Sequence, residues 1–200
     1  MKDKVEDDGA LTVEFLKLPE NTEKWPLVMK FLRLRTHVFV ERMKWDLLVD
    51  KEIEFEQYDT ATVATYIIVH RDDYVLGGAR LIRCDTRIGN EEHGYTYMIR
   101  DAYRGRIPLP REICSSPPPT DPHSWELTRL ISITNDRQTA RLILDSANEF
   151  IKREGGRRCL FLGPPAFLRM ASNYGYDPQP MGKVCGNETG RFLAFSCDVI

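Results

Sequence analysis

Charged side chains stand among large aromatic residues in two early segments, RTHVFVERMKW at 35–45 and EIEFEQYD at 52–59. Two later segments with strand character, GGARL at 77–81 and WELTR at 125–129, carry further arginines and a glutamate. Guanidinium groups, carboxylates and aromatic rings could together hold a substrate that bears both signs of charge in a partly dry pocket. A carboxylate among them could also remove a proton, provided that burial or neighbouring acids raise its pKa.

The first of these segments is predicted to form the end of a helix, and the second to follow it. Pro26 can open it, and it should run to about Met43, because apolar residues recur at helical spacing. Next, the runs at 65–70 and 74–84 flank the polar turn RDD and predict an antiparallel hairpin. Gly77 and Gly78 within it indicate a bulge or the close approach of another backbone.

Further strands and helices follow in alternation. We expect a strand at 125–133 and a helix from about Arg137 to Glu154 that Asn135 or Asp136 caps and Gly155 ends. A short buried strand at 159–163, a helix over PPAFLRMASNYG and a last strand RFLAFSCDV complete the chain. This order predicts one domain over 1–200, with residues 1–10 mobile. The fold class is a three-layer α/β/α sandwich around a mixed, mostly antiparallel sheet.

The spacing of Glu126 and Arg129 poses a geometric problem. Side chains of a regular strand alternate between the two faces, so these two would point in opposite directions. Either a bulge turns one of them, or they serve different surfaces. We predict a distortion within 126–133.

Composition excludes several classes of protein. The formal net charge is only −2, so a whole-chain attraction to nucleic acid is not expected. The five cysteines form no CxxC pair, which predicts reduced thiols and no metal site. The charged start MKDKVEDDGA is no signal peptide, and no window approaches a membrane span of about 18 apolar residues. A cytoplasmic protein without membrane insertion is expected.

The order Arg35, Phe39, Trp45, then EFEQYD, GGARL and ELTR resembles the acyl-homoserine-lactone synthase (autoinducer synthase) family. The resemblance is strongest over 31–135 and weakens afterwards into a likeness to the fold of the GCN5-related N-acetyltransferases, that is, of acyl-CoA N-acyltransferases. It implies a site of catalytic Glu56, Asp59, Arg80 and Glu126 and substrate-binding Arg35, Phe39, Trp45 and Arg129. In the family an Asp is usual where this chain has Glu56.

The resemblance also implies the reaction. The amine of S-adenosylmethionine attacks an acyl thioester carried on acyl carrier protein or coenzyme A, and its carboxylate then displaces methylthioadenosine to close the lactone, a quorum-sensing signal. S-adenosylmethionine is a substrate, and no cofactor or metal is implied. Alternatives are a coenzyme A-dependent N-acyltransferase for another amine and a non-catalytic S-adenosylmethionine-binding protein.

Two roles of Glu126, general base and anchor, stay open at this stage. Residues 137–158 carry a surplus of basic side chains that could dock an acidic carrier protein, or could be a solvated helix end. The turn NDRQTA before them lacks glycine, which favours a carrier protein over free coenzyme A as donor. Candidate walls of the acyl pocket are Leu142, Leu160, Leu162, Phe167 and Met170.

Overall fold

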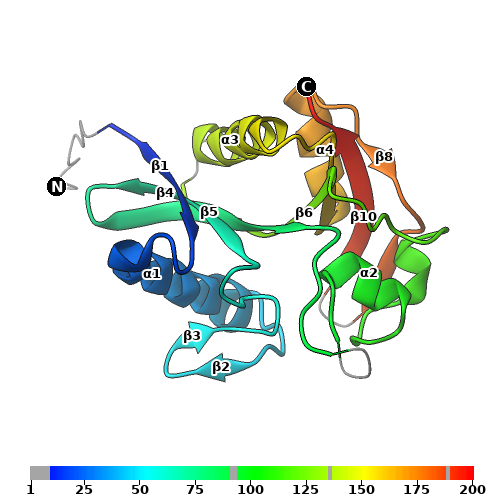
Figure 1. Cartoon of the computed structure of the whole chain (residues 1–200), viewed down its shortest axis with the longest axis horizontal. Coiled ribbons are helices and arrows are strands. Elements are labelled where there is room, and N and C mark those ends of the chain that lie inside the picture. The colour runs from blue at the N-terminus through cyan, green and yellow to red at the C-terminus, as the bar shows by residue number, and fades with distance from the viewer. Residues whose placement is uncertain (1–9, 91–93, 135–136, 188–189) are drawn as a thin grey trace, which may run out of the picture.

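The structure, a computed structural model, describes residues 10–90, 94–134, 137–187 and 190–200. At its centre is a twisted sheet with the strand order β1-β4-β5-β6-β7-β10-β8, and β9 pairs with β10 (Figure 1). Neighbouring strands are antiparallel except for β6 and β7, which are parallel. The strands are β1 (Thr12–Lys17), β4 (Thr65–Arg71), β5 (Tyr74–Arg83), β6 (Ser124–Ser132), β7 (Arg158–Gly163), β8 (Gln179–Pro180), β9 (Cys185–Asn187) and β10 (Gly190–Asp198).

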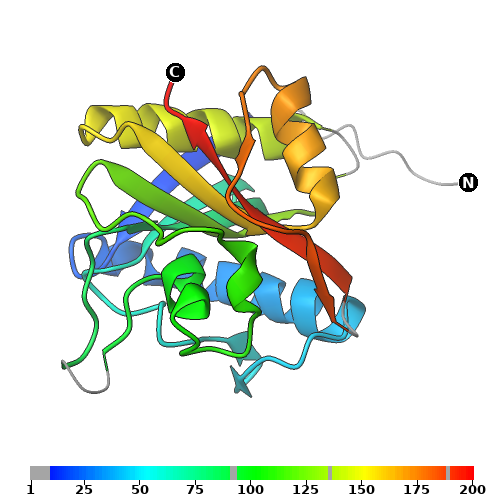
Figure 2. The ribbon, with the colours of Figure 1, turned by 90° about the vertical axis from the view of Figure 1, so that its right-hand side faces the viewer.

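Helices cover both faces of this sheet (Figures 1 and 2). One face, which we call the α1/α2 face, carries α1 (Trp25–Arg35), the small hairpin of β2 (Val49–Asp50) and β3 (Ile53–Glu54), and α2 (Met98–Tyr103). The other, the α3/α4 face, carries α3 (Gln138–Arg153) and α4 (Pro165–Asn173). The predicted three-layer α/β/α architecture with a mostly antiparallel sheet is confirmed. Single 3-10 turns lie at Thr22–Lys24 and Arg111–Ile113.

The first predicted helix has the expected extent but two geometries. It is α-helical to Arg35 and then widens into a π-helix, η2, over Thr36–Arg42. At the end of this wide turn the Trp45 N–H donates to the Phe39 carbonyl at 2.9 Å. Apolar spacing does not distinguish the two kinds of helix, so the sequence prediction missed the change. Such π-turns recur at functional sites.

The other long elements lie where they were predicted. The hairpin is β4–β5, the strand at 125–133 is β6, and the helix that follows is α3, within one residue at each end. The proposed caps at 135 and 136 lie outside the described residues, as do all but one of residues 1–10. The prediction missed β1, the β2–β3 hairpin and α2, which lack a long periodic pattern. Among described residues, no helix has the length and hydrophobicity that crossing a membrane needs.

Gly77 and Gly78 allow the central strands to approach the layers around them. A Cβ at Gly78 would lie 2.5 Å from the Ile67 carbonyl oxygen and 2.8 Å from the Phe31 ring, and one at Gly77 would collide with the Ile131 carbonyl. The pairing register also shifts beside them, against β4 and against β6. Both predicted features, an irregular ladder and close backbone approach, are present.

Replacing Gly78 with Ala should therefore destabilise the protein. The added methyl must displace backbone and the ring of Phe31, so the free energy of unfolding should fall by about 1–3 kcal/mol. Urea unfolding followed by circular dichroism measures this. Gly186→Ala in β9 is the control, because its Cβ would meet nothing closer than 3.4 Å. Equal stability of the two variants would contradict the close-approach argument.

Candidate functional site

Six charged side chains from separate segments meet on the α1/α2 face, and we call them the ion cluster. They come from α1, β3, the loop between β3 and β4, β5 and β6. The members are Arg35, Glu54, Glu56, Asp59, Arg80 and Arg129.

Arg35 and Asp59 form the innermost pair. The two terminal nitrogens of Arg35 donate to the two carboxylate oxygens of Asp59 at 2.7 and 2.8 Å, and its Nε donates to Glu54. Asp59 also accepts the Tyr66 hydroxyl at 3.1 Å and the backbone N–H of Glu56 at 3.0 Å. The side chains of Arg35 and Asp59 are fully buried. A bidentate pair of this kind fixes orientation as well as charge.

Arg80 joins this pair to the rest of the cluster. One terminal nitrogen donates to Glu56 at 2.7 Å and to the Thr128 hydroxyl at 3.1 Å, and the other lies 3.1 Å from Asp59. Within the described part of the chain its Nε has no hydrogen-bond acceptor. Burial by itself would lower the pKa of Arg80, but the charges of Asp59 and Glu56 raise it above its usual range. Arg80 therefore stays cationic.

A bulge in β6 brings Arg129 into the cluster. Between the pairs Gly78↔Ile131 and Arg80↔Thr128, two residues of β6 oppose one residue of β5. Arg129 is the first of the two and has φ +56°, a left-handed conformation that strains a residue with a side chain. The extra residue keeps Arg129 on the same face as Glu126, where it pairs with Glu54 and Glu56 at 2.9 Å each. The predicted distortion within 126–133 is confirmed.

Aromatic rings wall the cluster on one side. The rings of Phe39 and Trp45 stack with centroids 4.9 Å apart and planes within 8°. The guanidinium of Arg129 lies 5.6 Å from the centre of the Phe39 ring. The indole N–H of Trp45 is buried without an acceptor among the described residues. The structure thus places these two rings against the ion cluster, and their role in substrate binding is a proposal.

The charges of the ion cluster balance, because three guanidinium groups face three carboxylates. Burial would raise the pKa of Asp59 and of Glu56, but Arg80 lowers both below the usual range with help from Arg35 or Arg129. Glu56 and Arg129 keep 15% and 7% of their side-chain surface exposed, whereas the other members are almost completely enclosed. A substrate from solvent would meet these two first.

Glu126 lies next to the cluster but is held by other contacts. Its two carboxylate oxygens accept the backbone N–H groups of Met98 at 3.1 Å and Ile99 at 2.7 Å, in the first turn of α2. The side chain is fully buried. Burial raises its pKa to about 7, against the opposing effect of the Ile99 N–H and of Arg80. Glu126 thus combines a neutral-range pKa, which a base needs, with the contacts of an anchor.

Sequence reasoning missed four polar residues of this region. Glu54 has the spacing to share a face of its strand with Glu56, a signal that was present in EIEFE. Tyr58 lies in the quoted segment EFEQYD, and Thr128 lies in ELTR. Asp101 belongs to α2, whose position only the tertiary structure gives.

The predicted wall of the acyl pocket is wrong as a single surface. Leu142, Phe167 and Met170 pack in the core on the α3/α4 face, whereas Leu160 and Leu162 pack with the residues around α2. The side chains of β7 alternate, so its residues 160 and 162 point away from the α3/α4 face.

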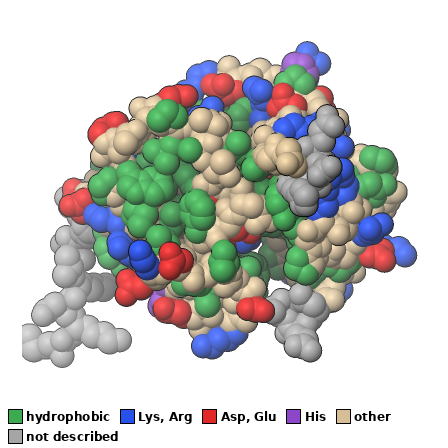
Figure 3. Space-filling model, turned by 60° about the horizontal axis from the view of Figure 1, so that its bottom comes forward, with side chains coloured by type: hydrophobic (Ala, Val, Ile, Leu, Met, Phe, Trp, Pro, Cys, Tyr) green, Lys and Arg blue, Asp and Glu red, His purple; other side chains and the backbone are tan. Residues whose placement is uncertain are grey.

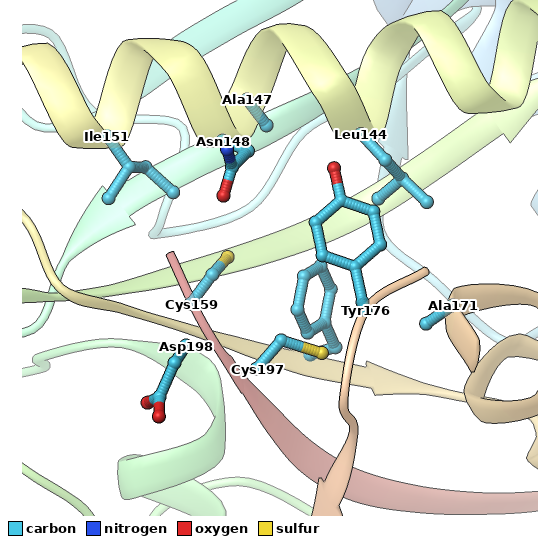
Figure 4. A pocket seen from close by; sticks show the side chains of 10 residues that line it. Leu144, Ala147, Asn148, Ile151, Cys159, Ala171, Tyr176, Cys197 and Asp198 are labelled. Carbon is cyan, nitrogen blue, oxygen red and sulfur yellow. The ribbon is translucent and has the colours of Figure 1, made fainter. Parts of the chain in front are cut away.

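A cavity of about 20 Å³ on the α3/α4 face is not this site either (Figure 4). It lies between α3, α4 and the strands β7 and β10, with Cys159, Cys197 and Tyr176 in its wall. Its volume is about that of one water. It lies across the sheet from the ion cluster and is too small for a cofactor or an acyl chain.

The basic side chains of 137–158 do not form one continuous surface. They lie at opposite ends of α3, whose 16 residues span about 24 Å. Arg141 pairs with Asp145, Arg158 pairs with Asp198, and Arg153 lies over the rings of Phe15 and Phe150. The hypothesis of a single docking face over 137–158 is therefore not supported by the geometry.

The pKa of Glu126 predicts a pH dependence of stability. The folded protein binds this proton more tightly than the unfolded chain, so the free energy of unfolding should fall between pH 4.5 and 7, by up to about 3 kcal/mol. Glu126→Gln has no proton to lose. The difference in unfolding free energy between it and the native protein, measured in urea, should therefore change between pH 5 and pH 8 in favour of the variant. A difference that is the same at both pH values would refute the raised pKa.

Known proteins of one family are similar to this chain in sequence. The profile of the autoinducer synthase family matches residues 21–90. An acyl-homoserine-lactone synthase of Acinetobacter nosocomialis is 25% identical over 167 residues, 78% of this chain and 83% of the relative. One of Pseudomonas aeruginosa is 28% identical over 125 residues, which cover 60% of this chain and 54% of the relative.

Solved structures share the fold. That of a coenzyme A-dependent acyl-homoserine lactone synthase, BjaI, with SAM and isopentyl-CoA superposes with TM-score 0.79 and 18% identity, over 96% of this chain and 84% of the other. An acyl-CoA N-acyltransferase from Pseudomonas aeruginosa has TM-score 0.61 and 14% identity, over 94% and 99%. The chain thus resembles the acyl-homoserine-lactone synthases in sequence, most specifically over residues 21–90, and has the fold that they share with acyl-CoA N-acyltransferases.

Proposed function

We propose that this protein is an acyl-homoserine-lactone synthase that uses S-adenosylmethionine and an acyl thioester. The observation that carries the proposal is the enclosed, charge-balanced ion cluster beside Glu126, in a chain that resembles such synthases. S-adenosylmethionine carries an ammonium, a carboxylate and a sulfonium, so its site must offer both signs of charge. The cluster offers both, at the side where Glu56 and Arg129 are accessible.

Each charged group has a role in this proposal. Arg129 would bind the substrate carboxylate and Glu56 would hold the cationic end, while the enclosed Arg80 and Asp59 would support them from behind. Arg35 is enclosed by Glu54 and Asp59, so it would fix these acids in place. Phe39 and Trp45 would pack against the adenosyl or thioester part.

Glu126 would act as the general base, directly or through a water. The α-ammonium has an ordinary pKa of about 8, and a base with a pKa near 7 can remove its proton far better than an ordinary carboxylate. The free amine then attacks the thioester carbonyl, the C–S bond breaks and the thiol leaves. In the second step a carboxylate oxygen of the substrate forms the lactone C–O bond, and the bond to the sulfonium sulfur breaks with release of methylthioadenosine.

The sheet provides a place for the acyl donor. β6 and β7 pair over Ser124–Leu127 and Arg158–Phe161. Beyond these residues, the described parts of the two strands are not paired with each other. The bulge at Arg129 lies where this pairing has ended. We expect the thioester to enter between the two strands, near backbone N–H groups that can stabilise an oxyanion. The acyl tail would then run toward the hydrophobic cluster around α2, which includes Leu160 and Leu162.

The identity of the acyl donor and the cellular location of the protein are also part of the proposal. Acyl carrier protein and acyl-CoA are both compatible with the open strands. Four exposed hydrophobic side chains between the end of η2 and the residue after β3 are available for contact with a donor. They are Met43, Leu48, Val49 and Phe55. Figure 3 views the molecule from the side of α1, β2 and β3 and shows hydrophobic side chains at its surface. A cytoplasmic location fits either donor.

Release of methylthioadenosine tests the function. The purified protein with S-adenosylmethionine and either acyl-CoA or acyl carrier protein thioesters should release methylthioadenosine and acyl-homoserine lactone in equal amounts. Glu126→Gln should lower kcat by about 10²–10⁴, the usual contribution of a general base, and Glu149→Gln, an exposed residue of α3, serves as control. Release of thiol without methylthioadenosine would instead identify an N-acyltransferase for another amine, and no release of either would favour a non-catalytic binding protein.

Glu56→Asp tests the one departure from the family pattern. Shortening the side chain withdraws a carboxylate from Arg80, now at 2.7 Å, and from Arg129, now at 2.9 Å. KM for S-adenosylmethionine should change by up to about tenfold, with kcat and KM for the acyl donor nearly constant, because uniform binding is affected. Unchanged KM would mean that the extra methylene has no part in fitting the substrate.

A further inference from the structure

Two buried carboxylates hold the short helix α2 against the site. Glu126 of β6 accepts the N–H groups of Met98 and Ile99 from outside the helix, and Asp101 acts from within it. A helix of six residues has little stability of its own, so its position depends on such contacts.

Asp101 is surrounded by three donors. Its carboxylate accepts the Thr96 N–H at 2.8 Å, the Thr96 hydroxyl at 2.8 Å and the Tyr58 hydroxyl at 3.0 Å. Asp101, Thr96 and Tyr58 are all almost completely buried. The two bonds from Thr96 close the turn that leads into α2, and this turn presents the Met98 and Ile99 N–H groups to Glu126.

The third donor connects α2 to the ion cluster. Tyr58 precedes Asp59 in the chain, and its ring lies 5.5 Å from the Arg80 guanidinium. One carboxylate thus touches both the turn that holds Glu126 and the segment that carries Glu56 and Asp59.

We propose that Asp101 is a positioning residue of the acyltransferase site: it fixes the first turn of α2, and through it Glu126, relative to the ion cluster. This inference deepens the proposed function and rests on it for its catalytic meaning. Asp101 itself touches no reacting group.

The consequence concerns how Glu126 titrates. The Met98 and Ile99 N–H groups stabilise its anion and oppose the effect of burial. If the turn loosens, this opposition weakens and the pKa of Glu126 rises above about 7. The other groups whose charges interact with Glu126 are Arg80 of β5, Cys84 directly after β5, Glu56 and Tyr58 before β4, Tyr97 before α2, Cys114, and Cys159 of β7.

Carbon-13 NMR of protein labelled in the glutamate carboxyl carbon tests this without any assay of activity. The Glu126 resonance is the one that Glu126→Gln removes. Asp101→Asn keeps the size of the side chain but offers one acceptor oxygen in place of two, so the pKa of Glu126 should rise by half a unit or more, as about 1 kcal/mol of lost anion stabilisation implies. Asp85→Asn, a partly exposed residue that pairs with Arg83, is the control.

A matched pair at Thr96 keeps the test decisive if Asp101→Asn does not fold. Thr96→Val removes only the hydroxyl that donates to Asp101 and should raise the pKa of Glu126 in the same direction, whereas Thr96→Ser retains a hydroxyl and should titrate like the native protein. If the Asp101→Asn and Thr96→Val variants fold, but Glu126 has the same pKa in both as in the native protein, the proposal is overturned.

Activity then separates this inference from the proposed function. In an active synthase the acid limb of the pH profile of kcat/KM should move upward by the same amount as the NMR pKa. An NMR shift in a protein that never releases methylthioadenosine would refute the synthase and leave the positioning role of Asp101 standing. An NMR shift with an unmoved acid limb would refute Glu126 as the base whose position Asp101 sets.

Discussion

Removing arginine side chains from water is costly unless carboxylates meet them, and this constraint governs the α1/α2 face of the protein. Arg35 and Arg80 have no exposed surface. The desolvation of one such ion costs several kcal/mol, which is recovered only with good geometry and with further hydrogen bonds. The carboxylates of Glu54, Glu56 and Asp59 provide both, and they hold together five segments of the chain. Fold and site therefore depend on the same contacts.

The backbone is distorted where this cluster meets the centre of the sheet. Arg129 adopts a left-handed conformation that costs of order 1 kcal/mol or more and persists because Glu54, Glu56 and Phe39 hold its guanidinium. The same stretch of β6 follows the point where its pairing with β7 ends. Strain, an open pair of strands and a buried acid of raised pKa thus lie close together, as expected of a site prepared for chemistry.

The comparisons divide the site in an informative way. Residues 21–90, which match the family profile, contain five of the six members of the ion cluster. Glu126 and Arg129 lie beyond that segment, in β6, within the longer match to the synthase of Acinetobacter nosocomialis, which is 25% identical over 167 residues.

The sequence by itself determined the long elements, and its resemblance to a known family predicted five of the six members of the ion cluster. Hydrophobic periodicity and turn residues are local signals, and they predicted α1, β4, β5, β6, α3 and α4 near their observed positions. The alternation rule also predicted a distortion within 126–133, since Glu126 and Arg129 could not both lie on one face of a regular strand. Only the tertiary structure decided that Glu54 joins the cluster, that Asp101 connects α2 to Tyr58, and that Glu126 lies beneath the first turn of α2. These contacts join residues 19 to 75 positions apart, and no local pattern encodes which distant donor a buried carboxylate will meet.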